Sequence, residues 1–190
     1  MSDVAKFKYG FTAKARGSGD RRFIRITDIT SNGKLSPTNP KYVDSTPGSD
    51  DFLVEKGDLL VARTGATFGK TVLITDDVPA LFASFLIKIS VRRDIVLPDF
   101  YWHFAQSSLY WRQAESLVSR GGQPQLNANA LKFIKLPIPP LEEQYRIISI
   151  LDKFDALVND LSFGLPAELE ARRKQYEHYR DRLLTFREAA

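Results

Sequence analysis

The apolar residues in the C-terminal quarter of the chain recur in alternating steps of three and four. Such spacing places them on one narrow stripe of a helix, which packs against another helix rather than into a broad core. We therefore expect a long helix over Leu141–Phe186 whose stripe contacts a second helix. The stripe consists of Ile147, Leu151, Phe154, Val158, Leu161, Leu169, Tyr176, Tyr179, Leu183 and Phe186.

The stripe is interrupted around Gly164–Pro166. Leu161, Leu165 and Leu169 are spaced by four and four, which corresponds to an insertion in the repeat, and Pro166 cannot donate a backbone hydrogen bond. The chain either continues in the same direction or folds back as a hairpin. We favour continuation, because the stripe resumes in phase. Such an element reaches about 65 Å and needs a second chain to cover it.

Residues 1–138 alternate between short apolar runs and turn residues. The runs are rich in β-branched residues and in part follow a two-residue period, which is typical of strands. Together they predict an α+β fold, in which a mixed sheet precedes the long interrupted helix. We expect strands over Arg21–Ile29, Phe52–Glu55 with Asp58–Arg63, Thr71–Thr75, Ala80–Val91 and Lys135–Ile138, and a helix over Pro98–Leu117.

Two further features complete this expected domain. Asn127 can cap a short helix over Ala128–Phe133, and Pro139-Pro140 ends the domain, which gives boundaries at residues 1–139 and 140–190. The core should draw on aromatic and aliphatic side chains of the last long strand and of the helix that follows. These are Phe82, Phe85, Ile87, Ile89, Phe100, Phe104, Leu109 and Trp111.

Charge is distributed unevenly along the 190 residues. Residues 1–140 hold 19 Lys and Arg against 13 Asp and Glu, whereas residues 141–190 hold 8 against 10. A basic globular part joined to a slightly acidic helix is compatible with a polyanionic partner such as nucleic acid. A solvated basic surface with no such partner is the alternative.

Several classes of protein are disfavoured by composition. The chain has no Cys and only two His, His103 and His178, which lie far apart in sequence, so we expect neither a disulfide framework nor a structural zinc site. No apolar run reaches the length of about 18 residues that a membrane span requires. We expect a cytoplasmic protein with no catalytic residues, no metal and no cofactor.

The segment Gly65–Thr71 (GATFGKT) invites comparison with a phosphate-binding loop. Only three residues separate its glycines where that motif needs four, and the β-branched residues that follow do not predict a helix. We therefore expect a tight turn between strands. Arg63 and Lys70 lie at its two ends, where they could contact a nucleic-acid backbone, but this segment by itself favours a plain hairpin.

A second polar loop, Ser119–Asn129, combines Arg120 with amide side chains around a Gly-Gly pair. Gln and Asn can pair with adenine, and Arg with guanine, in the major groove of DNA. An amide-rich surface loop that only caps a helix is the alternative.

Four stretches taken together resemble the specificity subunits of type I restriction–modification systems. The most specific part is the helix start Pro139–Gln144 (PPLEEQ) followed by Arg173–Phe186 (RKQYEHYRDRLLTF). The four stretches, which extend over nearly the whole chain, are Gly10–Ala15 with Phe23–Ile29, Gly57–Lys70, Pro137–Leu151 and Leu165–Phe186.

This resemblance implies a function. Residues 1–139 would form a target recognition domain for double-stranded DNA, and residues 140–190 a helical spacer. Subunits of this family are not catalytic: they recognise a bipartite DNA site and recruit a methyltransferase subunit and a restriction and translocation subunit. They usually carry two recognition domains and two spacers, so one of each implies a half-size subunit. A homodimer joined by antiparallel helices would complete it.

Under this interpretation, basic residues contact phosphates, and hydroxyl and amide groups read base edges. Two other functions remain open, a coiled-coil scaffold whose globular part binds protein and a nucleotide hydrolase at Gly65–Thr71. The candidate phosphate contacts are Lys14, Arg16, Arg21, Arg22, Arg63, Lys70 and Arg120, and the candidate base contacts are Thr12, Thr64, Gln123 and Gln125.

Overall fold

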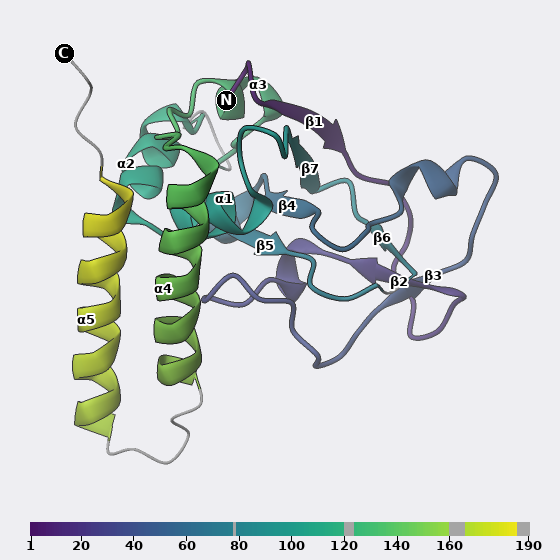
Figure 1. The fold of residues 1–190 in the computed structure, drawn as a ribbon. Helices are drawn as coiled ribbons and strands as arrows, with labels where there is room; N and C mark the ends of the chain where they lie inside the picture. Colours follow the sequence, from purple (N-terminus) through teal and green to yellow (C-terminus); the bar gives the residue numbers. More distant parts are fainter. Residues whose placement is uncertain (78, 120–123, 160–165, 186–190) are drawn as a thin grey trace.

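Two small β-sheets and a layer of helices are stacked, and a pair of long helices stands at one side (Figure 1). The computed structural model describes residues 1–77, 79–119, 124–159 and 166–185. The strands are β1 (Ala5–Tyr9), β2 (Arg21–Ile24), β3 (Tyr42–Val43), β4 (Leu59–Ala62), β5 (Thr71–Leu73), β6 (Ala80–Phe82) and β7 (Leu86–Val91). The helices are α1 (Pro98–Ala105), α2 (Ser108–Leu117), α3 (Ala128–Lys132), α4 (Leu141–Asn159) and α5 (Pro166–Leu184).

The larger sheet has the strand order β1-β7-β4-β5 and is antiparallel throughout. Its central pair is registered with Leu59 opposite Ile89 and Val61 opposite Ile87. The smaller sheet has the order β3-β2-β6, in which β2 pairs with β6 in parallel. This mixture of sheets and helices confirms the α+β class.

Strand β4 is apolar along its whole length because both of its faces are buried. Leu59 and Val61 belong to the core cluster that includes the helices, whereas Leu60 and Ala62 belong to the cluster shared with β2 and β6. Side chains alternate between the two faces of a strand. The larger sheet is therefore the middle layer, with α1 and α2 on one side and the smaller sheet on the other.

The helix expected over Pro98–Leu117 is in fact two helices. Gln106 and Ser107 separate α1 from α2, and the Ser107 hydroxyl accepts a hydrogen bond from the amide of Tyr110. A serine in this position caps a new helix start, which the periodicity of the apolar residues did not indicate. Phe100 and Phe104 are buried as predicted, but Leu109 and Trp111 are only half-buried.

Three of the predicted strand segments were wrong in extent or type. The strand from Arg21 ends at Ile24, because the next residues form a 3-10 turn in which the Arg25 amide donates to the Asp28 carboxylate. Phe52 ends another 3-10 turn. At the segment expected to be the last strand, the Lys135 amide donates to the side chain of Gln113 and not to a neighbouring strand.

The alternating pattern predicted that Phe85 belongs to the core, and this prediction was wrong. It lies in the turn between β6 and β7, and 54% of its surface is exposed. The turn is closed by the Leu86 amide, which donates to the Ala83 carbonyl. Phe82, Ile87 and Ile89 are buried as expected.

The two long helices form a hairpin, so the predicted straight continuation was wrong. Helix α5 runs back beside α4 (Figure 1), and Phe154 stacks on Tyr176 and Tyr179 at centroid distances of 6.3 and 5.6 Å. Pro166 is the first residue of α5 and not a kink within one helix. Proline is favoured at a helix start, where its missing N–H costs nothing.

The described part of the predicted stripe is therefore largely covered within this chain. Ile147, Leu151 and Tyr176 are buried in the core cluster that includes α1 and α2, with Phe154 and Leu183 packed at its edge. Tyr179 remains 38% exposed. The side chains of Val158 and Leu169, and all of Leu161 and Phe186, lie outside the described residues. No helix in the described part is long and apolar enough to span a membrane.

Candidate nucleic-acid interface

The turn between β4 and β5 is held in one conformation by glycines and backbone hydrogen bonds. Gly65 and Gly69 have positive φ angles of 70° and 80°, which are strained for other residues. The Gly69 amide donates to the Ala62 carbonyl at 2.8 Å, and the Tyr110 hydroxyl donates to the Gly69 carbonyl at 2.9 Å. A strand and not a helix follows at Thr71, so the nucleotide-hydrolase alternative lacks its phosphate-binding helix.

The second polar loop lies directly against this turn. The Gly65 amide donates to the Pro124 carbonyl at 3.1 Å, and the Leu126 amide donates to the Arg63 carbonyl at 2.8 Å. Between these bonds, Thr64 and Gln125 form an isolated antiparallel bridge. The two loops that the sequence singled out separately therefore form one surface. As predicted, the side chain of Asn127 caps the helix that follows, here α3.

A third segment joins the other side of the turn. The Arg63 amide donates to the Phe85 carbonyl at 3.0 Å, and the Ser84 amide donates to the Phe11 carbonyl at 2.8 Å. Gly10 is needed for this approach, since a Cβ atom there would lie 2.2 Å from the Ala83 carbonyl oxygen. Four segments are thus linked by backbone hydrogen bonds. We call residues 10–16, 63–65, 83–85 and 124–128 the loop surface.

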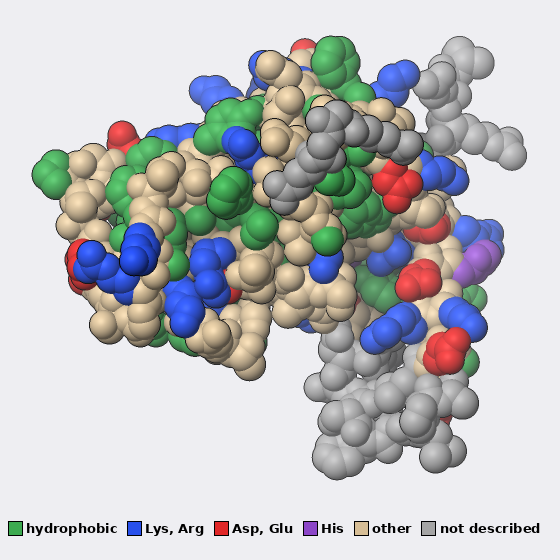
Figure 2. Space-filling view, turned by 180° about the vertical axis from the view of Figure 1, so that it is seen from behind, with side chains coloured by type: hydrophobic (Ala, Val, Ile, Leu, Met, Phe, Trp, Pro, Cys, Tyr) green, Lys and Arg blue, Asp and Glu red, His purple; other side chains and the backbone are tan. Residues whose placement is uncertain are grey.

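Aromatic and basic side chains are interleaved on the loop surface and beside it. The guanidinium of Arg63 lies over the ring of Tyr9 at 5.0 Å, and the Tyr9 hydroxyl accepts a hydrogen bond from the Ala128 amide. Figure 2 shows Lys and Arg side chains gathered on one end of the rear face, the end formed by the smaller sheet. Such an arrangement suits a phosphate backbone and unpaired or exposed bases.

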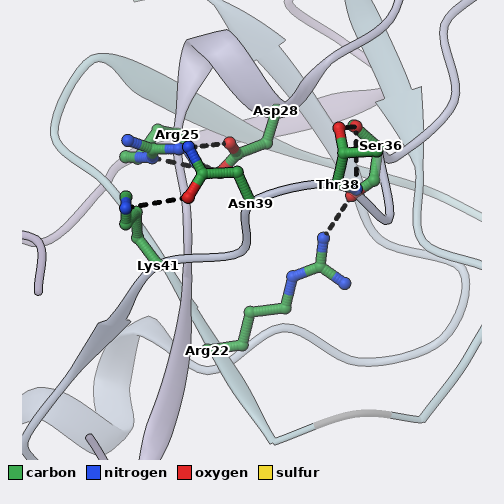
Figure 3. Close-up of polar contacts among 7 residues, drawn as sticks. All are labelled: Arg22, Arg25, Asp28, Ser36, Thr38, Asn39 and Lys41. Carbon is green, nitrogen blue, oxygen red and sulfur yellow. Dashed lines mark hydrogen bonds and ion pairs between the residues drawn. The ribbon is translucent and has the colours of Figure 1, made fainter. Parts of the chain in front are cut away.

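Several basic residues beside the smaller sheet are fixed by polar partners. Arg25 forms an ion pair of 2.7 Å with the buried carboxylate of Asp28, and Lys41 donates to Asn39 (Figure 3). Arg16 pairs with Asp44 at 2.6 Å, with both side chains exposed. Fixed guanidinium groups lose little freedom on binding a phosphate, although an exposed acidic neighbour weakens their attraction for it.

Arg22 is placed apart from the loop surface. It donates to the Ser36 carbonyl at 2.7 Å (Figure 3) and lines a cavity of about 570 Å³ between the smaller sheet, α1 and α4. Phe23, the next residue in β2, points to the opposite face of that strand. The Nε of Arg22 is buried without a hydrogen-bond partner among the described residues.

The remaining predicted residues are distributed as follows. Thr12, Lys14 and Gln125 are exposed on the loop surface, and Lys70 is half-buried at the end of the turn. Thr64 is only 5% exposed, so its backbone rather than its hydroxyl contributes to the surface. Arg21 is half-buried in β2. Arg120 and Gln123 lie outside the described residues.

The sequence did not indicate three residues that the structure brings to this region. Phe85 was assigned to the core, and Tyr9 and Arg25 were not singled out. The Arg-Asp spacing of a 3-10 turn at Arg25–Asp28 is a local signal that could have marked Arg25. No group of three or more metal-ligating side chains occurs in the part of the chain that the structure describes.

The chain is similar to known proteins of one family. Residues 1–171 match the family model described as "Type I restriction modification DNA specificity domain". The chain is 38% identical over 133 residues to a putative type I restriction enzyme specificity subunit of Haemophilus influenzae, covering 70% of this chain and 33% of that protein. It is 31% identical over 179 residues to the Escherichia coli EcoR124I/EcoR124II specificity subunit, covering 84% and 43%.

A solved structure on complex assembly and conformational transition of the type I R-M system contains a chain of the same fold. The TM-score is 0.62 at 20% identity, and the match covers 90% of this chain and 46% of that chain. At this identity the likeness shows the fold alone. The chain thus spans less than half the length of these relatives.

Proposed function

The chain belongs to the family of type I restriction–modification DNA specificity domains, and from this premise we propose that the loop surface reads the DNA sequence at which such a system acts. The sequence resemblance is thereby confirmed at the level of the family. The observation that supports the role of the loop surface is the set of backbone hydrogen bonds that join four separate segments into one basic, aromatic surface.

On this surface we propose a division of roles. Lys14, Arg16 and Arg63 of the loop surface, together with Arg21, Lys70 and Arg120 outside it, contact phosphates and set the position of the duplex. The exposed side chains of Thr12 and Gln125, with Gln123, read base edges. The buried Thr64 holds the turn against Gln125. Arg22 mainly stabilises the 36–41 loop, which it contacts at Ser36.

The domain division follows the same proposal. Residues 1–139 form the recognition domain, and residues 140–190 form a helical arm that contacts the methyltransferase and restriction subunits. The chain itself recognises DNA and does not catalyse. Support comes from the attachment of the arm: the Gln144 side chain bonds to Ile95, Leu97 and Pro139, so the position of α4 is fixed relative to the recognition domain.

We further propose that two copies act together on a bipartite site. A second copy would bring a second loop surface to the other half of such a site. Because α5 already covers the stripe of α4, contact between copies would use the outer faces of the arm. Tyr145, which is 61% exposed on α4, and the half-exposed Tyr179 on α5 offer aromatic surface there.

Methylome sequencing of cells that express this chain with its methyltransferase subunit tests the proposal. The expected result is methylation at one interrupted sequence motif, symmetric if two copies act together. A variant with Gln125→Ala and Thr12→Ala should change or abolish the motif, whereas Gln175→Ala on the exposed face of α5 should not. A normally expressed wild-type complex that methylates no specific motif and binds no duplex would contradict the proposal and favour the protein-binding scaffold.

A further inference from the structure

Phe85 occupies the centre of the loop surface. Its carbonyl accepts the Arg63 amide, and the preceding Ser84 amide donates to Phe11, so the turn lies between two segments assigned to DNA. The ring is 54% exposed although large aromatic side chains are usually buried. Backbone hydrogen bonds on both sides hold the turn, so the ring projects from a fixed base.

A hollow of about 270 Å³ lies beside this ring. Short side chains border much of it, including Ala13, Ala15 and Ala83, and Phe23 contributes apolar surface. Among the described residues that line it, Arg25 alone is charged, and its ion pair with Asp28 fixes the guanidinium. The hollow therefore offers apolar faces with one oriented set of N–H donors, which suits a flat heteroaromatic ring.

We propose that Phe85 inserts into the bound duplex as an apolar wedge and that the hollow receives the nucleobase it displaces. This inference rests on the proposed DNA-reading function. Apolar side chains inserted between base pairs unstack and kink DNA in other proteins. A displaced base stacks favourably on an aromatic ring, and Arg25 can donate to its polar edge.

The charges around the hollow favour a base over a side chain of another protein. Lys14, Arg16 and Arg63 lie on the same loop surface and attract the phosphates that flank a displaced nucleotide. Asp28, the carboxylate in contact with Arg25, is buried and paired. Insertion between two neighbouring base pairs would also make recognition depend on how easily the DNA deforms there. The protein could thereby discriminate sequences at a position where it makes no contact with a base edge.

The test uses the full chain in complex with its methyltransferase subunit and duplexes of the methylated motif. 2-Aminopurine replaces each base of one half-site in turn, because its fluorescence rises when it is unstacked. For the wild-type complex we expect a several-fold rise at one position other than the base to be methylated, since methyltransferases extrude that base themselves. Phe85→Ala should remove this rise and weaken binding to the motif about tenfold or more, while Phe85→Trp should retain both.

Two controls separate this role from a general effect. Phe133→Ala removes an aromatic side chain that is 71% exposed on the surface but lies just after α3, and it should leave the fluorescence unchanged. Ala13→Leu fills the hollow and should reduce the rise, whereas Ala156→Leu, at an exposed position of α4, should not.

The outcomes distinguish this inference from the proposed function. The insertion of Phe85 is contradicted if the wild-type complex binds its motif but no position becomes unstacked, or if Phe85→Ala leaves the rise in fluorescence intact. In either case the proposal that the loop surface reads DNA is unaffected. If the wild-type complex binds no motif at all, the proposed function fails and the wedge fails with it.

Discussion

Nε2 of His103 lies 2.8 Å from Oδ1 of Asp152, and this contact connects α1 to α4. The imidazole is fully buried, whereas the Asp152 side chain is 59% exposed at the edge of the helix. Together with the bonds of Gln144, it attaches α4 to α1 and to the segment before α1 through side chains rather than through the connecting chain alone. The aromatic helix at His103 thus has a structural role in positioning α4.

Removal of the Asp152 carboxylate should weaken this attachment. In Asp152→Ala the buried Nε2 loses its partner, so we expect the free energy of unfolding to fall by about 1–3 kcal/mol. Denaturant unfolding followed by circular dichroism measures this change. Asp94→Ala breaks an ion pair between two exposed side chains and should lower the free energy of unfolding much less. Equal losses for both variants would contradict the role given to His103.

Substitution of Gln144 should destabilise the protein more than substitution of Asp152. Its side chain is fully buried, accepts the Leu97 amide and donates to the carbonyls of Ile95 and Pro139. Gln144→Leu leaves these backbone groups without partners, so we expect a loss of at least about 2 kcal/mol. Gln175→Leu, at an exposed position of α5, is the matched control. A stable Gln144→Leu variant whose α4 amides exchange as slowly as in the wild type would refute this account.

Lys70 tests the phosphate part of the proposal. Lys70→Ala should weaken binding to target and random duplexes alike and lower the slope of log K against log salt by about 0.9. Fluorescence anisotropy across a salt series gives both quantities. Lys153→Ala, at an exposed position of α4, should leave the slope unchanged. A loss confined to the target duplex would assign Lys70 to base reading instead.

Gln125 tests the base-reading part. Its side chain is exposed while its backbone pairs with Thr64 and Ser119, so truncation should spare the fold. Gln125→Ala should lower affinity for the target by about 1–3 kcal/mol and leave random duplex binding within error. Competition binding with single-base variants of the target would show relaxed preference at one position. No change at any position would remove Gln125 from the set of readers.

The buried tyrosines lead to a prediction about the stability of the protein at alkaline pH. Burial raises the pKa of Tyr176 to about 12, with Asp155 adding to the effect, and burial raises the pKa of Tyr101 and Tyr110 well above the ordinary value. A raised pKa means that the folded state keeps the tyrosine proton to a higher pH than the unfolded state does. The associated stability is complete below about pH 10 and is lost as the pH rises further.

Near-ultraviolet absorbance of tyrosinate checks this expectation. Three of the seven tyrosines should resist ionisation at pH values where the others titrate, until the protein unfolds. Tyr176→Phe should reduce the number of resistant groups by one and leave the fold intact. Titration of all seven in one step, with the circular dichroism of the folded state preserved, would show that these hydroxyls are accessible.

Local patterns in the sequence predicted much of this protein correctly. The β4–β5 hairpin, the Asn127 cap and the burial of Ile87 and Ile89 follow from short-range spacing and from the chemistry of turns and caps. The misplaced boundaries also have local causes. The break at Ser107 and the 3-10 turn at Arg25–Asp28 arise from side-chain hydrogen bonds that compete with regular structure.

By itself, the sequence determined the family, the fold class and the identity of the polar loops, because motif, period and turn chemistry act over a few residues. Only the tertiary structure decided that the loop at Thr64 meets Gln125, that Phe85 is exposed on the other side of this loop, and that α5 reverses to cover α4. These relationships join residues that are distant in sequence. They depend on which of several available apolar surfaces the closed chain buries, and no local pattern specifies that choice.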